Sequence, residues 1–204
     1  MQRLIKAALA VCAAAALAGC AAPRTAEKND YSKFRAEKPR SVLVGPVGNR
    51  SVEVDAPDSL LTTVTMPLAE RGYYVFPVNL VKQVMNEEGM SDADMVHAND
   101  PVRLAGLFGA DSVLYISIER WDARYAVIGT TVTVALTYTL KSGKTGETIW
   151  ETQQSVAYSS RSDQGLIGAL INAAIAKAAP SYMPLARQAN TTAIYVRGRG
   201  LPAG

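Results

Sequence analysis

The chain is poor in the residues that carry most enzyme chemistry. Its 204 residues include one histidine, His97, and two cysteines, Cys12 and Cys20. A catalytic triad or a histidine-ligated metal site needs partners that we do not find in the sequence. Charged residues are also few, at 19%, whereas 49% of the residues are hydrophobic. This balance excludes an intrinsically disordered chain and predicts a sizeable hydrophobic core.

The N-terminus has the parts of a secretory signal peptide. A short basic start is followed by an apolar run over residues 7–17 and by small residues before Cys20. The apolar run is too short for a membrane-spanning helix, which needs about 20 residues. We therefore predict that residues 1–19 are a signal peptide, cleaved between Gly19 and Cys20.

The tetrapeptide Leu-Ala-Gly-Cys at residues 17–20 resembles the lipobox of bacterial lipoproteins. In those proteins the cysteine thiol is diacylated and the new amino group is acylated, so the resemblance implies that Cys20 is a lipid anchor. Three acyl chains are enough for stable anchoring. The residue after this cysteine is Ala21 and not aspartate. By resemblance to the sorting of Gram-negative lipoproteins, this implies the outer membrane. The alternative is an ordinary signal peptide in which Cys20 occurs by chance.

Cleavage changes the composition of the chain. The mature protein spans residues 20–204, and the loss of Arg3 and Lys6 lowers its formal charge from +3 to +1. We therefore expect no nucleic-acid partner. Cys12 leaves with the signal peptide and Cys20 becomes a thioether, so no thiol remains for disulfide or zinc chemistry. The core alone must hold the domain together.

The mature chain divides into three segments. Residues 20–40 are rich in charge and contain proline, and we interpret them as the lipidated cysteine and a tether, with Tyr31 and Phe34 packing back on the domain. Residues 41–194 form the periplasmic domain. Residues 195–204 form a C-terminal tail that we expect to fray.

The first half of the domain alternates strands and helices. Residues 41–44 and 73–78 have the apolar character of short strands, and Pro77 puts the second one near an edge or an end. Helical spacing predicts three helices: residues 60–71 with a kink or break at Pro67, residues 80–88 capped by Asn79, and residues 101–108 capped by Asp100 and closed by Gly109.

The second half changes to a period of two. A strand follows Asp111, residues 132–140 alternate between apolar residues and threonine or alanine, and residues 147–158 form a third, more polar strand. Short links between them predict an antiparallel meander. A helix over residues 166–178 comes next. The fold class is therefore α/β (mixed α+β): a single domain, with a mixed sheet, a C-terminal antiparallel meander and helices packed on it.

One segment invites a nucleotide-binding interpretation. Gly143, Lys144 and Thr145 resemble the end of a phosphate-binding loop, but that motif needs a further glycine where this chain has Tyr138. The motif also needs a helix to follow, whereas the pattern here is that of a strand. We therefore predict a hairpin turn.

The remaining polar residues give no reactive cluster. His97 lies in a polar stretch, which favours a surface loop. Glu87, Glu88, Asp92 and Asp94 could supply an acid pair for hydrolysis, but they flank a predicted helix end, where solvated carboxylates are ordinary. We predict no catalytic residue, no metal site and no cofactor.

Two surfaces are candidates for interaction. The basic run of Arg35, Lys38 and Arg40 is either a solvated linker or a contact for anionic headgroups. The helix over residues 166–178 carries almost no charge. It either packs on the sheet with one face, or it presents a surface to a partner or to a second copy of the chain through Ala169, Ala173 and Ala176.

Four segments in order resemble a family of Gram-negative outer-membrane lipoproteins, known as domain of unknown function 799. The segments are FRAEKPRSVLV at 34–44, PLAERGYYVFP at 67–77, GADSVLY at 109–115 and TGETIW at 145–150. The turn at Gly45-Pro46 departs from the proline-rich turn of the family. The resemblance implies a periplasmic domain similar to the N-terminal domain of TolB and to LpoB-type lipoproteins. It also implies an association with a CsgG-like secretion lipoprotein, and no enzymatic activity.

We therefore predict a non-enzymatic lipoprotein, anchored in the outer membrane through Cys20 with its domain facing the periplasm. It would act as an accessory or assembly factor in an envelope or secretion complex. The alternative is an LpoB-like regulator of a peptidoglycan synthase. It ranks lower because a tether of about 20 residues spans at most roughly 70 Å, which is short for crossing the wall. A carboxylate-dependent hydrolase is a third hypothesis.

Overall fold

The computed structural model describes residues 29–126, 129–159 and 182–204. The elements in this part of the chain are, in order, α2 (Ser32–Glu37), β1 (Ser41–Val44), β2 (Gly48–Asn49), α3 (Ala56–Glu70), β3 (Tyr74–Val75), α4 (Val78–Glu87), α5 (Ala93–Ala98), α6 (Pro101–Phe108), β4 (Ser112–Ala126), β5 (Gly129–Ser142), β6 (Thr148–Ser159) and α8 (Met183–Tyr195).

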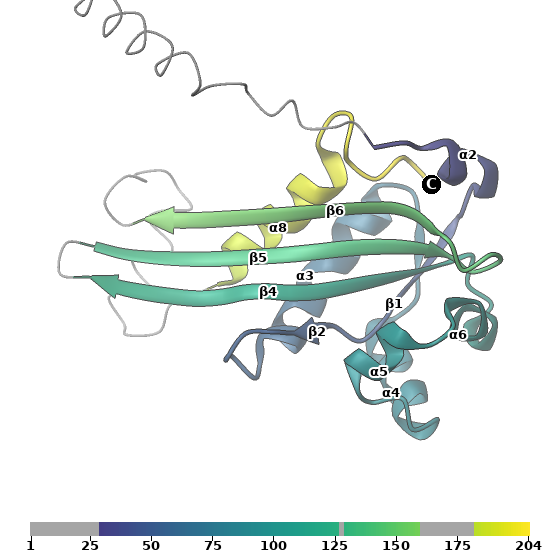
Figure 1. Cartoon of the computed structure of the whole chain (residues 1–204), viewed down its shortest axis with the longest axis horizontal. Helices are drawn as coiled ribbons and strands as arrows, with labels where there is room; N and C mark the ends of the chain where they lie inside the picture. Colours follow the sequence, from purple (N-terminus) through teal and green to yellow (C-terminus); the bar gives the residue numbers. More distant parts are fainter. Residues whose placement is uncertain (1–28, 127–128, 160–181) are drawn as a thin grey trace, which may run out of the picture.

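One open, mixed sheet organises the described residues. The strand order is β3-β1-β4-β5-β6, and β2 also pairs with β4. Each of β1, β2 and β3 runs parallel to its partners, whereas β4, β5 and β6 form an antiparallel meander. Figure 1 shows the meander as three long arrows, with α3 and α8 behind it and α4, α5 and α6 grouped beside one end. The predicted fold class is confirmed.

The sheet separates two hydrophobic clusters because neighbouring residues of a strand point to opposite faces. On β1, Val42 and Val44 belong to the large cluster, whereas Leu43 between them belongs to the small one. Leu114 and Tyr115 divide in the same way on β4. The first part of the sheet is therefore buried on both faces.

The large cluster lies under α3 and α8. The apolar residues of β5 supply its floor, and α8 contributes Leu185, Ala189 and Ile194, all of which are buried. A chain of buried polar groups also crosses it. The Tyr138 hydroxyl donates to Asn190 Oδ1 at 2.7 Å, and Asn190 Nδ2 donates to Thr63 Oγ1 at 2.8 Å. Because each of these groups has a partner, the chain joins β5, α8 and α3 without leaving a polar atom unsatisfied.

The small cluster lies under α4, α5 and α6. It is built from Val81, Met85, Val96 and Leu104 packing on the sheet. It covers the beginning of β4 and not its end: beyond a bulge between Ile118 and Arg120, β5 is the only strand among the described residues that pairs with β4. In the far half of the meander, the described residues therefore cover only one face of the sheet, the face that packs against α8.

Two details of the predicted helices are wrong. Helix α3 starts at Ala56, before the predicted residue 60, and it runs through Pro67 to Glu70, so of the predicted kink or break the break is absent. Helix α4 begins at Val78, directly after Pro77, so Asn79 lies inside its first turn and is not the cap. The caps at Asp100 and Gly109 are confirmed: the Asp100 carboxylate accepts from the Val102 amide, and Gly109 has φ +71°.

The C-terminal tail is packed, and the expectation that residues 195–204 fray is wrong. Leu201 is fully buried. Arg71 Nε donates to the Leu201 carbonyl at 2.8 Å, and the Tyr73 hydroxyl donates to the Pro202 carbonyl at 2.7 Å. These donors come from the end of α3 and the residues just after it, so the tail is held by side chains that are distant in the sequence.

Candidate functional site

The predicted anchor, Cys20, and the cleavage position after Gly19 lie outside the described residues. Asn29 is the first residue of the described part of the chain, and its amide donates to the Gly198 carbonyl at 3.2 Å. Its side-chain Nδ2 donates to the Glu151 carbonyl at 2.9 Å and to the Arg199 carbonyl at 3.0 Å. The chain therefore joins the domain beside β6 and the C-terminal tail.

Helix α2 docks directly after this point, so the predicted tether over residues 20–40 is too long. Phe34 is buried in the large cluster, and the Tyr31 hydroxyl donates to the Gly200 carbonyl at 2.7 Å. Both residues pack back on the domain, as predicted. Lys38 ends the helix in a left-handed conformation, with φ +46°, and its amide donates to the Phe34 carbonyl. The chain can therefore turn sharply from α2 into β1.

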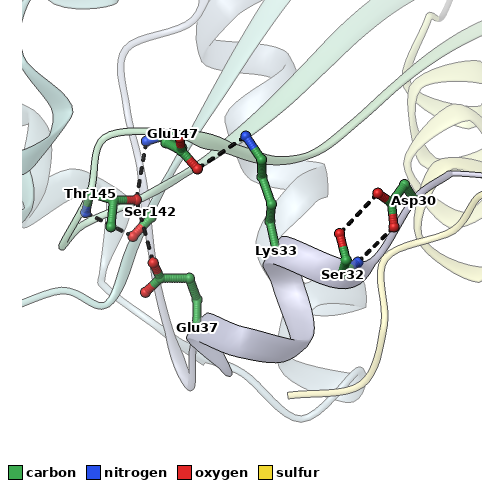
Figure 2. Close-up of polar contacts among 7 residues, drawn as sticks. All are labelled: Asp30, Ser32, Lys33, Glu37, Ser142, Thr145 and Glu147. Atoms are coloured by element: carbon green, nitrogen blue, oxygen red, sulfur yellow. Dashed lines mark hydrogen bonds and ion pairs between the residues drawn. The ribbon is translucent and has the colours of Figure 1, made fainter.

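Polar contacts join α2 to the turn between β5 and β6, as Figure 2 shows. Lys33 forms an ion pair with Glu147 at 3.0 Å, and the Thr145 hydroxyl donates to Glu37 at 3.4 Å. At the start of the helix, Asp30 accepts from the amide and the hydroxyl of Ser32, both at 2.9 Å. The pKa of Asp30 is lowered, mainly by the hydrogen bond from the Ser32 amide.

The Gly143-Lys144-Thr145 segment is the turn of this hairpin, as predicted. Ser142 Oγ accepts from the amides of Lys144 and Thr145, both at 3.1 Å. A strand, β6, follows the turn. The backbone groups that would hold a phosphate in a nucleotide-binding loop are used within the turn itself.

Asp111 connects the start of β1 to the start of β4. Its Oδ2 accepts from the amides of Arg40 and Ser41 and from the Ser41 hydroxyl, each at 3.0 Å. Burial raises the pKa of Asp111, but the hydrogen bonds from Arg40 and Ser41 outweigh burial and the pKa is lowered. The carboxylate is therefore a fixed structural acceptor.

The basic run lies beside this connection. Arg35, Lys38 and Arg40 are all exposed. They follow Asn29 closely in the sequence. Both interpretations of the run, a solvated surface or a contact for anionic headgroups, remain open.

The four candidate carboxylates lie at helix ends, two at the end of α4 and two at the start of α5. Glu87 and Glu88 are exposed at the end of α4, where Glu87 accepts from the Gln83 side chain at 3.0 Å. Asp92 caps α5 by accepting from the Met95 amide at 2.8 Å, and Asp94 is exposed in the first turn of that helix. Each carboxylate is thus explained by a helix end.

His97 is not in a surface loop, which corrects the prediction. It lies on α5, half-buried, with Nε2 2.8 Å from the Pro46 carbonyl and its ring 4.9 Å from that of Tyr115, edge to face. The residues that precede it carry no helical apolar pattern long enough to reveal a six-residue helix. Among residues 29–126, 129–159 and 182–204, no group of three or more histidine, cysteine or acidic side chains could hold a metal ion.

An apolar cavity of about 220 Å³ opens between α3, α4 and the connection from β1 to β2. Pro46, Leu61, Val81 and Met85 contribute to its wall. Its charged lining residues, Lys82 and Asp58, form an exposed ion pair at 2.7 Å. Most of the lining residues are apolar, so the cavity has the chemistry of a contact for an apolar group.

The other predicted surface cannot be placed. Ala169, Ala173, Ala176 and the whole segment over residues 166–178 lie outside the described residues. Within the part that the structure does describe, no helix is both long enough and apolar enough to cross a membrane.

Comparisons with known proteins assign the chain to a family. The family model described as "Putative lipoprotein GNA1162-like" matches residues 29–196. The "Putative lipoprotein NMB1124/NMB1162" of Neisseria meningitidis serogroup B is 34% identical over 188 residues, which cover 92% of this chain and 87% of that protein.

A solved structure agrees with this assignment. The crystal structure of lipoprotein GNA1162 from Neisseria meningitidis matches with 33% identity and a TM-score of 0.59, and the match covers 69% of this chain and 98% of that chain. The LpoB C-terminal domain from Salmonella enterica is more distant, at 24% identity and a TM-score of 0.41, covering 58% of this chain and 82% of that chain. The extent of the family match, together with the curated relative, shows that this chain belongs to the GNA1162-like lipoprotein family.

Proposed function

We propose that the protein is a non-enzymatic accessory or assembly factor of an envelope or secretion complex, with a CsgG-like lipoprotein as its partner. In this proposal the chain is cleaved between Gly19 and Cys20, Cys20 is acylated, and the domain faces the periplasm from the outer membrane. Membership of a lipoprotein family supports the anchor. The partner rests on the family resemblance alone.

The observation that carries the proposal is the short connection between the anchor and the domain. Asn29 is already fixed to the Glu151 and Arg199 carbonyls, so at most the eight residues 21–28 separate it from Cys20. At about 3.5 Å per residue, the link from Cys20 to Asn29 reaches on the order of 30 Å at most. A domain held so closely is suited to a partner at the same membrane.

The same length argues against the synthase regulator. A regulator that is anchored in the outer membrane must reach through the wall to a synthase at the inner membrane. The predicted tether of 20 residues was already short for this purpose, and the docking of α2 removes about half of it. We therefore rank this alternative second.

A hydrolase is the third candidate, and the geometry gives it little support. Asp92 is used as a helix cap, and Glu87, Glu88 and Asp94 are exposed at helix ends. An alanine substitution at each of the four positions is expected to leave the cellular phenotype unchanged.

The experiment that tests the proposal is crosslinking in cells, followed by recovery of the tagged full chain from membranes. We expect recovery of a CsgG-like lipoprotein, and loss of that partner in a Cys20→Ser variant. A Cys12→Ser variant is the matched control, because it changes a cysteine that the mature chain lacks. Recovery of the protein alone, or its fractionation as a soluble periplasmic protein, would overturn the proposal.

A second measurement separates the two binding roles. A flexible insertion of about 20 glycine and serine residues between positions 28 and 29 lengthens the link without touching the docked residues. An accessory factor at the membrane surface should lose crosslinking yield. A regulator that works across the wall should keep its yield or gain from the longer link.

A further inference from the structure

Strand β6 forms one edge of the sheet. It pairs with β5 along its length, and no other described strand pairs with it. Figure 1 shows it as the outermost arrow of the meander, with α2 and the C-terminal tail near its beginning. The side chains of Gln153, Ser155 and Ala157 are exposed along this strand. The edge is therefore open over its second half, as far as the described residues extend.

One contact shows which backbone groups of β6 point outward from this edge. The Glu151 carbonyl accepts from the Asn29 side chain, so it points away from β5. In an antiparallel strand, alternate residues direct both their N–H and their C=O groups to the same side. Gln153, Ser155 and Ala157 therefore present their backbone donors and acceptors outward, and none of these groups has a partner among the described residues.

The edge strand at the opposite side of the meander is protected, whereas β6 is not. The far half of β4 begins with a bulge between Ile118 and Arg120, and it carries Arg120, Asp122 and Arg124. Bulges and charges are the usual means by which proteins prevent edges from pairing. Residues 152–159 of β6 have no charge, no proline and no register shift.

We propose that β6 pairs with β6 of a second copy of this chain, antiparallel, about a two-fold axis at Ser155. In this arrangement Ser155 lies opposite its own equivalent, and Gln153 lies opposite Ala157 of the other copy. Every outward N–H and C=O of the three residues then finds a partner, which is the self-complementarity that a two-fold interface requires. Since residues 152–159 are uncharged, no like charges meet across the axis.

Two further features agree with this arrangement. The Asn29 contact closes the edge at Glu151, so it limits the pairing to the residues centred on Ser155. The two-fold axis is perpendicular to the joined sheet. The two Asn29 residues therefore lie at the same position along this axis, on the same side of the dimer. If Cys20 is acylated as proposed above, both short links can then reach one membrane.

The first test is the mass of the full chain, extracted from membranes and measured by light scattering after size-exclusion chromatography. We expect a dimer. Ser155→Lys puts two like charges opposite each other at the axis and should raise the dimer dissociation constant at least tenfold. Ser91→Lys, at another exposed serine outside the sheet, should leave the dimer intact. Circular dichroism checks that each variant folds.

The second test places a cysteine at the axis. Directly opposed residues of a hydrogen-bonded antiparallel pair have Cα atoms about 5.5 Å apart, within the range that a disulfide spans. Ser155→Cys should therefore give a crosslinked dimer under mild oxidation, whereas Ser91→Cys should not.

Three outcomes would overturn the proposal. One is a monomeric wild-type chain, which includes the case in which residues 160–181 of the same chain cover the edge. The second is a dimer that Ser155→Lys does not weaken. The third is a Ser155→Cys chain that forms no crosslink. None of these results bears on recovery of a CsgG-like partner, so the two proposals can fail separately.

Discussion

The hydrophobic clusters on the two faces of the sheet differ in extent. The large cluster, under α3 and α8, includes the far strands of the meander, a buried chain of hydrogen bonds and the docked α2. The small cluster, under α4, α5 and α6, covers only the beginning of the sheet. The difference indicates that the α8 face holds the domain together, and that the opposite face leaves the far half of the meander without a cover of described residues.

The largest expected difference between the faces is in the cost of removing a leucine. Leu185 on α8 is fully buried in the large cluster, and Leu104 on α6 is 3% exposed in the small one. We expect Leu185→Ala to lower the free energy of unfolding by about 4 kcal/mol and Leu104→Ala by about 2 kcal/mol, because the shallower site can relax into the space. Urea unfolding measures both. Equal or reversed costs would remove the distinction between the faces.

A pair of glycines tests how tightly the small-cluster side is packed. A Cβ at Gly143 would lie 2.6 Å from the Ala110 carbonyl oxygen and 2.7 Å from Ala105 Cβ, whereas a Cβ at Gly106 would meet nothing within 4 Å. We expect Gly143→Ala to cost about 1–3 kcal/mol through overpacking. Gly106→Ala, inside α6, should instead stabilise the protein by up to about 1 kcal/mol. The midpoints of thermal unfolding should therefore shift in opposite directions, and a shift in the same direction would contradict the packing described here.

Two buried tyrosines, one in each hydrophobic cluster, give a further test of the difference between the two faces. Tyr138 of the large cluster donates to Asn190, whereas the Tyr115 hydroxyl at the small cluster is buried without a partner in the described structure. Tyr138→Phe leaves Asn190 Oδ1 unsatisfied and should cost about 1–2 kcal/mol. Tyr115→Phe removes an unsatisfied hydroxyl and should be neutral or slightly stabilising at pH 7. A Tyr115→Phe cost as large as that of Tyr138→Phe would show a missing partner for Tyr115.

The same tyrosines predict an alkaline loss of stability. Burial raises the pKa of Tyr115 to about 12, and Asp100 adds to the shift; burial also raises the pKa of Tyr138. Above pH 10 the unfolded chain loses these protons before the folded chain does, so the free energy of unfolding falls as the pH rises. Tyr115→Phe should make this fall less steep between pH 10 and 12. Unfolding titrations at several pH values measure the slope, and an unchanged slope would exclude Tyr115 as a contributor.

The smallest expected effect is at the seam between α2 and the hairpin turn. Lys33 and Glu147 are both more than half exposed, so we expect Lys33→Ala to change the free energy of unfolding by less than about 0.5 kcal/mol. Phe34→Ala, at the next residue, should cost several kcal/mol, because that ring is buried in the large cluster. Chemical unfolding of the two variants compares them. A large effect of Lys33→Ala would show that the polar contacts in Figure 2, and not the buried ring, hold α2 in place.

The elements that we predicted correctly carry strong local signals. The meander has a period of two, the helix α6 begins with Asp100-Pro101 and ends at Gly109, and Tyr31 and Phe34 are the two aromatic residues of a charged segment. The elements that we missed carry weak ones. Helix α8 buries mostly alanines and Asn190 at helical spacing, and this pattern is much less hydrophobic than that of an ordinary core helix.

The class of the fold, the strands of the meander and the lipoprotein family were predicted from the sequence alone, and these predictions are confirmed. Tertiary contacts were needed to show that Asn29 is bound to the domain, that the C-terminal tail is packed, and which sheet edge is left open by the described residues. The reason is that these features depend on contacts between distant residues. Asn29 donates to the Glu151 carbonyl and Tyr73 donates to the Pro202 carbonyl, and no local periodicity of the sequence predicts either contact.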